Sequence, residues 1–318
     1  MSTILPTKRL GKNPLEVTVM GFGTAPIGNM RGAGDETRAI ETIQFAYENG
    51  IRLFDSAPLY GLGESEIRVG KALQGLPRDS FVISTKVGRV LNRDRSAFVY
   101  DYSYDGVMRS FEGSLERLGV EAVDIVLVHD PDADTVDHEK DALDSAFPTL
   151  ADLRDQGVIK AIGSGMNQWQ MLERFARNAD VDVFLLAGRY TLLEQTSLDF
   201  LDYCRETGIG IFLGGVYNSG ILATGPKADA KYNYANAPQS ILQKATAIQE
   251  ICAQHGVALN VAALHFPPAN PAITSLVVGA VKPAEVEANL AARLEELPEE
   301  LWHDLRQEGL IERSAPTP

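Results

Sequence analysis

Four polar residues of this sequence stand at the ends of short apolar runs, or just after them, and could act together on a proton. Asp55 and Tyr60 follow one such run, Lys86 ends the run FVISTK, and His129 ends the run DIVLVH. A free tyrosine has a pKa of about 10, so it exchanges a proton near neutral pH only beside a cation that favours its phenolate. Lys86 could supply that cation, Asp55 could keep the lysine charged and oriented, and His129 could donate a hydrogen bond to a substrate oxygen.

Each of these residues also has a structural explanation when it is taken alone. An aspartate at a strand end often caps the next helix, a lysine is often a solvated charge, and a tyrosine is often half-buried packing. His129 alone is more simply explained as a hydrogen-bonded core histidine. All four explanations would have to hold at once, each at a strand end, and so the sequence favours one shared site.

The elements that would carry these residues alternate regularly between strand and helix. We expect strands at 17–20, 51–54, 81–86, 123–128, 159–162, 181–186, 209–213 and 274–278, with helices between them at 35–49, 64–73, 107–118, 142–154, 169–177, 197–206 and 241–254 and a last helix starting at Pro283. Eight strands each followed by a helix predict a (β/α)₈ TIM barrel, here a single domain over 1–318. The competing open sheet usually has a Gly-x-Gly-x-x-Gly turn after its first strand, which GFGTAPIG does not match.

Three segments without strand or helix periodicity are longer than ordinary connections, namely 88–103, 130–137 and 217–238. Each follows a strand, so a barrel would gather them at its C-terminal face, where barrel active sites form. Six tyrosines lie on or beside them: Tyr100, Tyr102, Tyr104, Tyr217, Tyr232 and Tyr234. They could line a pocket for a polar, ring-shaped substrate or belong to a lid that shields the barrel mouth.

Composition limits the classes of partner. The 318 residues include 29 basic and 43 acidic ones, a net charge of −14, which disfavours nucleic acid and anionic membranes. A dinucleotide remains compatible, because backbone N–H groups can bind its pyrophosphate. The two cysteines, Cys204 and Cys252, show no metal-ligand or disulfide spacing, and no signal peptide or membrane-spanning run is recognisable. We therefore expect a cytoplasmic protein without a metal, and the sequence leaves its oligomeric state open.

Six segments resemble aldo-keto reductases along almost the whole chain. They are GFGT at 21–24, FDSAPLYG at 54–61, STK at 84–86, VHD at 128–130, IGSGMNQW at 162–169 and VVGAVKPAEVEANL at 277–290. The resemblance implies that Asp55, Tyr60, Lys86 and His129 form a catalytic tetrad, with Tyr60 as the acid-base group. It also implies a nicotinamide cofactor lying extended across the barrel mouth.

The same resemblance assigns cofactor contacts along the chain. Gly23 and Thr24, with Asp55, would approach the nicotinamide, and Ser164 and Asn167 would bind its carboxamide. The stretch 214–222 would cradle the pyrophosphate through Gly214, Gly215, Val216, Ser219, Gly220 and Leu222. Gly279, Val281, Lys282, Glu285 and Asn289 would flank the adenosine.

Departures from the family pattern bear on the choice of cofactor. Glu285 replaces the arginine of NADPH-selective members, and Gly279 replaces a frequent lysine. A carboxylate can accept a hydrogen bond from a ribose 2′-OH but repels a 2′-phosphate, which favours NAD, while Lys282 leaves NADP possible. Glu285 could instead be a first-turn residue favoured by the helix dipole. In addition, Gly214 stands where many members stack an aromatic ring, and Ala187 stands where they place an amide.

HDPD at 129–132, SGMNQW at 164–169 and GGVYNSGIL at 214–222 resemble the sugar-oxidising branch of the family. This implies oxidation of the anomeric C1 hydroxyl of an aldose, of the L-fucose or D-threo-aldose type, to a lactone. Pyridoxal 4-dehydrogenase and general aldehyde reductase activities are alternatives, and a non-catalytic dinucleotide-binding barrel is a third. A barrel glycosidase is disfavoured, because it needs paired carboxylates and the seventh strand ends in LGG without an acid.

Overall fold

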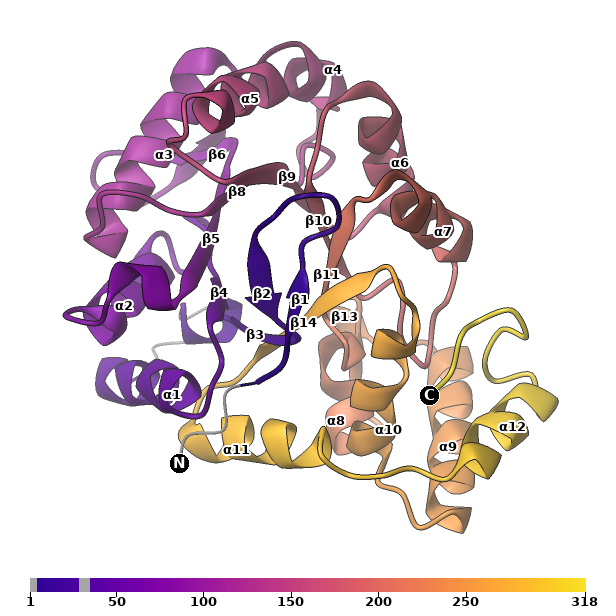
Figure 1. Ribbon diagram of the computed structural model, residues 1–318. Coiled ribbons are helices and arrows are strands. Elements are labelled where there is room, and N and C mark those ends of the chain that lie inside the picture. The colour runs from indigo at the N-terminus through magenta and orange to yellow at the C-terminus, as the bar shows by residue number, and fades with distance from the viewer. Residues whose placement is uncertain (1–4, 29–34) are drawn as a thin grey trace.

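The computed structural model describes residues 5–28 and 35–318, and eight parallel strands close into a barrel within them (Figure 1). In barrel order these strands are β3 (Met20–Gly23), β4 (Leu53–Asp55), β5 (Val82–Val87), β8 (Ile125–His129), β9 (Ala161–Met166), β10 (Val183–Ala187), β11 (Gly210–Gly214) and β14 (Ile273–Gly279). The predicted TIM-barrel fold is confirmed.

Helices surround this barrel. They are α1 (Glu36–Glu48), α2 (Glu64–Leu73), α3 (Tyr104–Leu118), α4 (Glu139–Asp141), which continues through the π-helical turn η3 (Ala142–Ala146) into α5 (Phe147–Asp155), α6 (Trp169–Asn178), α7 (Leu198–Thr207), α8 (Ile221–Thr224), α9 (Gln239–Gln254), α10 (Leu259–His265), α11 (Pro283–Ala292) and α12 (Glu299–Gln307). Short 3₁₀ turns are η1 (Ala25–Ile27), η2 (Arg78–Ser80), η4 (Asn218–Gly220) and η5 (Pro267–Ala269). None of the helices in the described ranges is long and apolar enough to cross a membrane.

Local sequence explains where several helices start and stop. The Asp35 side chain accepts a hydrogen bond from the backbone N–H of Arg38 and caps α1, and Ser103 caps α3 in the same way. The α3 helix ends at Gly119, whose φ of 65° lies in the left-handed region that glycine adopts without a Cβ clash.

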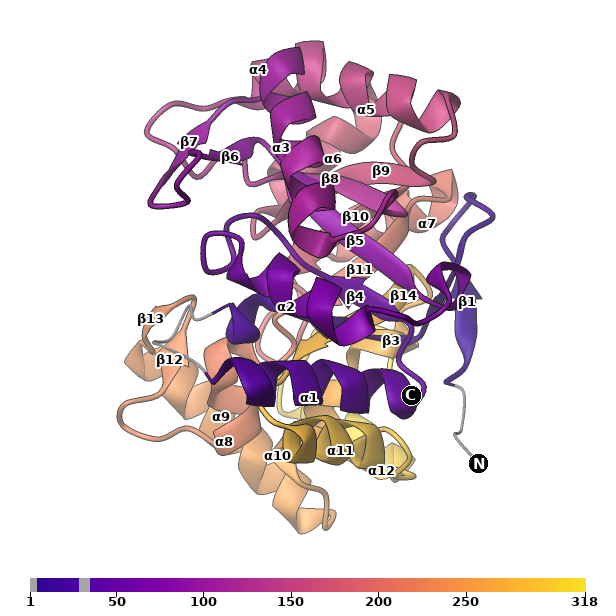
Figure 2. The same ribbon diagram turned by 90° about the vertical axis from the view of Figure 1, so that its left-hand side faces the viewer.

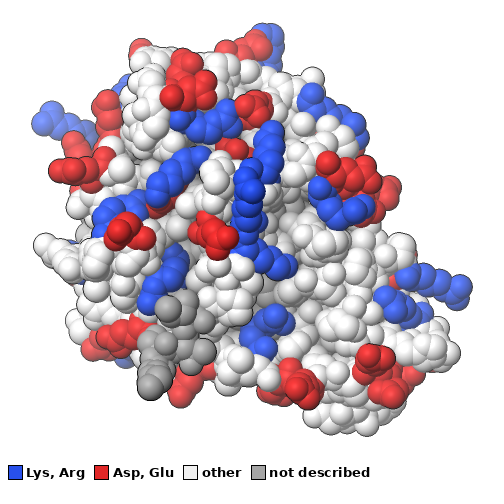
Figure 3. Space-filling model, viewed as in Figure 1, with Lys and Arg blue, Asp and Glu red and all other residues white. Residues whose placement is uncertain are grey.

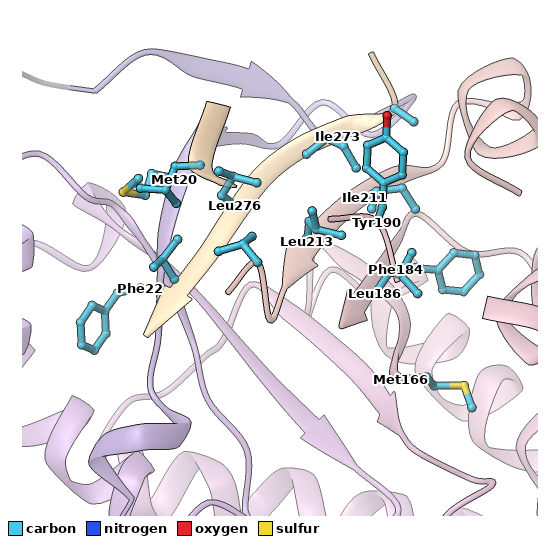
Figure 4. Packing of buried hydrophobic residues seen from close by; sticks show 14 of the residues in the cluster. Met20, Phe22, Met166, Phe184, Leu186, Tyr190, Ile211, Leu213, Ile273 and Leu276 are labelled. Carbon is cyan, nitrogen blue, oxygen red and sulfur yellow. The ribbon is translucent and has the colours of Figure 1, made fainter. Parts of the chain in front are cut away.

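Alternation along each strand divides the core into two layers. On β11, Ile211 and Leu213 face the helices, where Figure 4 shows them among other outward-facing residues, while Phe212 points into the barrel. The barrel interior is filled by Leu10, Val17, Leu53, Val82, Ile125, Leu127, Ala161, Val183, Leu185, Phe212 and Val277. The barrel is therefore a packed core rather than a pore, and the side chains at its mouth have an apolar floor beneath them.

The two ends of the barrel are built differently. An antiparallel hairpin of β1 (Thr7–Arg9) and β2 (Glu16–Thr18) covers one end, with acidic and basic side chains interspersed over that face (Figure 3). Two other hairpins lie at the opposite end (Figure 2): β6 (Arg89–Leu91) with β7 (Phe98–Tyr100), and β12 (Lys231–Tyr232) with β13 (Ala235–Asn236). This opposite end carries the C-terminal ends of the barrel strands.

Some boundaries differ from the predicted ones. The first barrel strand does not span 17–20: Val17 and Thr18 belong to β2, and the barrel strand starts at Met20. The segments 88–103 and 217–238 are not irregular throughout, because each contains a hairpin whose strands are two or three residues long, too short for alternation to be recognised. The α10 helix was not predicted because it is buried on most sides and has no polar stripe.

Candidate active site

Strand register places Asp55 and Lys86 beside each other. Asp55 on β4 pairs with Ser84 on β5, so both side chains face the same side, and Lys86 lies two residues further along that face. The Lys86 ammonium donates to both Asp55 carboxylate oxygens at 2.9 and 2.8 Å and to the carbonyl of Ser56 at 2.7 Å. The Ser84 hydroxyl donates to Asp55 Oδ1 at 2.9 Å. The lysine is 1% exposed and the aspartate 2%, which makes this a buried ion pair.

Burial would by itself disfavour the charged lysine, but the Asp55 carboxylate more than compensates, and the pKa of Lys86 is raised. The lysine therefore stays an ammonium at the floor of the site. Its Nζ lies 5.0 Å from the centroid of the Tyr60 ring. A fixed positive charge thus faces the phenol.

Tyr60 lies in the loop after β4 and is half-buried. Burial raises the pKa of its phenol to about 12, the Lys86 ammonium lowers it, and the carboxylates of Asp55 and Asp130 raise it. In the protein alone the phenol is protonated at neutral pH. Its acidity depends on the balance between one cation and two anions nearby.

His129 is 5% exposed, and its ring meets that of Tyr60 edge-on, with 5.9 Å between the ring centroids. Burial, with smaller contributions from Arg89 and Lys86, lowers the pKa of His129 well below its usual value, so the imidazole is neutral. A neutral imidazole carries one N–H. It can therefore donate one hydrogen bond to an oxygen held between the two rings.

Gly165 makes room for the lysine. It pairs with His129 across β8 and β9, and a Cβ at this position would stand 3.1 Å from Lys86 Cε. A larger residue would therefore force the lysine side chain to shift by a few tenths of an ångström. This steric role cannot be recognised in the motif at 162–169, because it depends on the strand register.

A second ion pair at the mouth was missed from sequence. Arg89 on β6 donates to Asp130 at 2.8 Å, and Tyr102 donates from its hydroxyl to the carbonyl of His129 at 2.7 Å. Burial raises the pKa of Asp130 to about 6, against the lowering effect of Arg89. Arg89 on the β6–β7 hairpin and Tyr102 just after it therefore hold the point where β8 ends at His129. The available signal was a charged residue shortly after each catalytic candidate, Asp130 directly after His129 and Arg89 three positions after Lys86.

The residues expected near a nicotinamide border this group. Gly23 ends β3 next to Asp55 on β4, and the Thr24 hydroxyl donates to the Asp55 carbonyl at 2.9 Å. Ser164 is fully buried and its hydroxyl donates to the Val128 carbonyl at 2.8 Å, so it supports β8. Asn167 lies half-exposed just beyond β9, and its backbone N–H donates to the Asp130 carboxylate.

The stretch expected around a pyrophosphate follows β11. After Gly214, positive φ angles recur at Gly215 (64°), Ser219 (60°) and Gly220 (103°), and the N–H groups of Asn218 and Gly220 donate back to the carbonyls of Gly215 and Tyr217, so the stretch is a tightly turned loop. A Cβ added at Gly220 would meet no atom within 4 Å, so the chain is open to a ligand there. Val216 and Leu222 are buried and anchor the stretch.

The residues expected around an adenosine begin where β14 ends. Gly279 pairs with Gly23, and Asn289 on α11 accepts a hydrogen bond from the Tyr217 hydroxyl at 2.7 Å. Val281 and Lys282 are exposed, at 43% and, for the lysine side chain, 57%. Because β11, β14, β3 and β4 are consecutive neighbours in the barrel, most of the expected cofactor residues form one strip that ends at Asp55, while Ser164 and Asn167 lie apart from it, on and just beyond β9. A strip of this kind suits an elongated dinucleotide.

A model of the aldo/keto reductase family matches residues 19–308. The chain belongs to this family. A pyridoxal 4-dehydrogenase of Microbacterium luteolum is 37% identical over 96% of this chain and 97% of its own, and a D-threo-aldose 1-dehydrogenase of a Pseudomonas species is 39% identical over 96% of both. The holo form of an aldo-keto reductase from Bacillus halodurans has the same fold, with a TM-score of 0.81 and 23% identity over 98% of both chains. This aldo-keto reductase is thus a nicotinamide-dependent oxidoreductase with a small-molecule substrate.

Proposed function

We propose that this aldo-keto reductase oxidises the C1 hydroxyl of an aldose to a lactone with NAD⁺, using Asp55, Tyr60, Lys86 and His129. The observation that carries the proposal is the buried Lys86 ammonium, which is held by Asp55 and faces the phenol of Tyr60. Relatives that oxidise an aldose or pyridoxal support the oxidative direction.

Each residue has a defined task in this reaction. Tyr60, as phenolate, accepts the proton of the C1 hydroxyl, and Lys86 stabilises the phenolate before that transfer. The N–H of His129 donates to the C1 oxygen and holds it within reach of Tyr60. A bound nicotinamide would supply the acceptor for the hydride that leaves C1. The C1–H electron pair and the hydroxyl proton thus go to different acceptors, and C1 becomes the lactone carbonyl.

The preference for NAD rests on Glu285. One carboxylate oxygen accepts the backbone N–H of Val281 at 2.9 Å, and the other lies 3.9 Å from the Lys282 ammonium. This fixes a negative charge beside the strip and close to the Lys282 ammonium, which disfavours a 2′-phosphate. Glu285→Arg should improve kcat/KM for NADP⁺ relative to NAD⁺ by at least tenfold. A ratio that stays within twofold would remove the basis for the NAD assignment.

The function is tested by following NADH formation with L-fucose, D-arabinose, L-galactose and pyridoxal, each with both nicotinamides. Pyridoxal is the second candidate because one 37%-identical relative is a pyridoxal 4-dehydrogenase. Absence of sugar oxidation together with rapid aldehyde reduction by NADPH would refute both the direction and the cofactor.

Tyr60→Phe separates an enzyme from a non-catalytic dinucleotide-binding barrel. This variant removes only the hydroxyl that exchanges the proton, so it should lose turnover by at least a thousandfold. Cofactor binding, measured by quenching of protein fluorescence, should remain within about threefold. Retained turnover in Tyr60→Phe would contradict the role of the phenol.

A further inference from the structure

Asp130 places a carboxylate at the edge of the site that the proposed reaction does not use. Its side chain is 20% exposed, and its Oδ2 lies 3.5 Å from Nε2 of His129, the imidazole nitrogen on that side of the ring. The C1 oxygen would occupy the space beside the same imidazole. A group attached to the neighbouring carbon would therefore come within reach of Asp130.

The carboxylate is held in place from several directions. Arg89 donates to Oδ2 at 2.8 Å and is only 7% exposed, and the backbone N–H of Asn167 donates to the same carboxylate. The hydroxyl of Tyr102 donates to the Asp130 carbonyl at 3.2 Å. An ionised carboxylate accepts about four hydrogen bonds, so these contacts leave capacity for a ligand.

The backbone at Asp130 is also unusual. Its φ of 37° lies in the left-handed region, which residues other than glycine seldom adopt because it strains the backbone. Such strain is typical of positions where the direction of a side chain matters. Here it directs the carboxylate toward the mouth immediately after His129.

We propose that Asp130 accepts a hydrogen bond from the substrate hydroxyl next to the reacting carbon and thereby selects polyhydroxylated substrates. This inference rests on the proposed function. A carboxylate held by Arg89 and Asn167 is a prepositioned acceptor, and a simple aldehyde offers it no donor. Substrates without the neighbouring hydroxyl leave the acceptor unsatisfied and react more slowly.

The test compares a sugar with its analogue that lacks one hydroxyl. For D-arabinose the matched analogue is 2-deoxy-D-ribose, which differs only in lacking the C2 hydroxyl. The unmodified protein should prefer the hydroxylated sugar in kcat/KM by about 10- to 100-fold, the range for a hydrogen bond to a charged group. In Asp130→Asn and Asp130→Ala this preference should shrink to less than about threefold, through slower reaction of the hydroxylated sugar.

Asp132→Asn is the matched control, because Asp132 lies on the same loop and accepts from Gln168 instead. It should keep the preference of the unmodified protein. Reduction of propanal, which has no hydroxyl, can also change in the Asp130 variants, because Asp130 lies beside His129 and acts on Tyr60, but it should fall much less than sugar oxidation does.

The two ways of failing are distinguishable. If the Asp130 variants keep the full preference, or lose propanal reduction as strongly as sugar oxidation, the inference is overturned and the proposed function stands. If the unmodified protein oxidises no aldose at all, both the proposed function and the inference about Asp130 are refuted.

Discussion

Replacing Lys86 by methionine tests the electrostatic core of the site. The substitution keeps the length of the buried side chain and removes its charge. With 5.0 Å between the ammonium and the Tyr60 ring centroid, and an effective dielectric of about 20, the lost attraction to a phenolate is about 3.3 kcal/mol. This corresponds to a further rise of about 2.4 in the pKa of Tyr60, since each 1.36 kcal/mol is about one pKa step.

Oxidation needs the phenolate, so its rate at fixed pH follows the fraction of Tyr60 that has lost its proton. We expect kcat/KM for sugar oxidation in Lys86→Met to fall about 200-fold at any pH on the rising limb of the profile. The rising limb itself should move to higher pH. The assay is NADH formation under kcat/KM conditions between pH 6 and 10.

Loss of the lysine also leaves Asp55 buried without its cation, which costs stability. Circular dichroism and urea denaturation must therefore confirm that the variant is folded at the assay temperature. Lys160→Met is the matched control, because it removes a lysine that pairs with a buried aspartate, Asp124, at 2.7 Å and should change the rate by less than twofold. A loss below tenfold in folded Lys86→Met, with an unmoved pH profile, would refute the role of the ammonium.

Three further predictions concern stability. Arg117→Met should lower the free energy of unfolding by about 3–5 kcal/mol, because Glu66, fully buried and 2.6 Å from Arg117 Nε, would lose its partner; a urea titration showing under 1 kcal/mol would contradict this. Gly61→Ala should cost about 3 kcal/mol or more, because a Cβ would lie 1.7 Å from the Gly28 carbonyl oxygen at a φ of +66°, and a melting temperature unchanged within 2 °C would count against it. Hydrogen bonds to two carboxylates raise the pKa of His138 above 6.5. The stabilisation that protonated His138 gives to the fold is therefore complete below pH 6.5 and is lost as the pH rises through the raised pKa of the folded protein. The gap in melting temperature between the unmodified protein and His138→Gln should accordingly shrink from pH 5.5 to pH 8.5, and a constant gap would exclude this linkage.

Sequence patterns predicted the barrel well because each strand is a short apolar run that ends in a recognisable turn. The α2 helix was predicted with its observed bounds, Glu64–Leu73, and most barrel strands were found within a few residues. The first strand was wrong because Val17 and Thr18 follow the same alternation whether they pair within a hairpin or within the barrel. A single-strand pattern does not contain the identity of the partner strand.

Because the pattern of one strand does not identify its partner strand, only some residues around the site could be recognised from the sequence. Lys86 and His129 could be recognised because each ends its strand, and ends of parallel strands converge. Ser84, Gly165 and Arg89 could not, because their roles depend on which residue stands opposite them across the barrel or on a hairpin of three-residue strands. Register is set by the packing of the whole barrel, so contacts across strands become visible only in the structure.

The charges around Tyr60 connect substrate recognition to proton transfer. Lys86 lowers the pKa of the phenol, whereas the carboxylate of Asp130 raises it. A substrate hydroxyl that donates to Asp130 would partly offset the negative charge of this carboxylate. The carboxylate would then raise the pKa of Tyr60 less, so the phenol would become more acidic when a polyhydroxylated substrate binds. Asp130→Asn should therefore move the rising limb of propanol oxidation to lower pH, opposite in sign to Lys86→Met. If both variants moved the limb in the same direction, the two charges could not act on the phenol as the geometry requires.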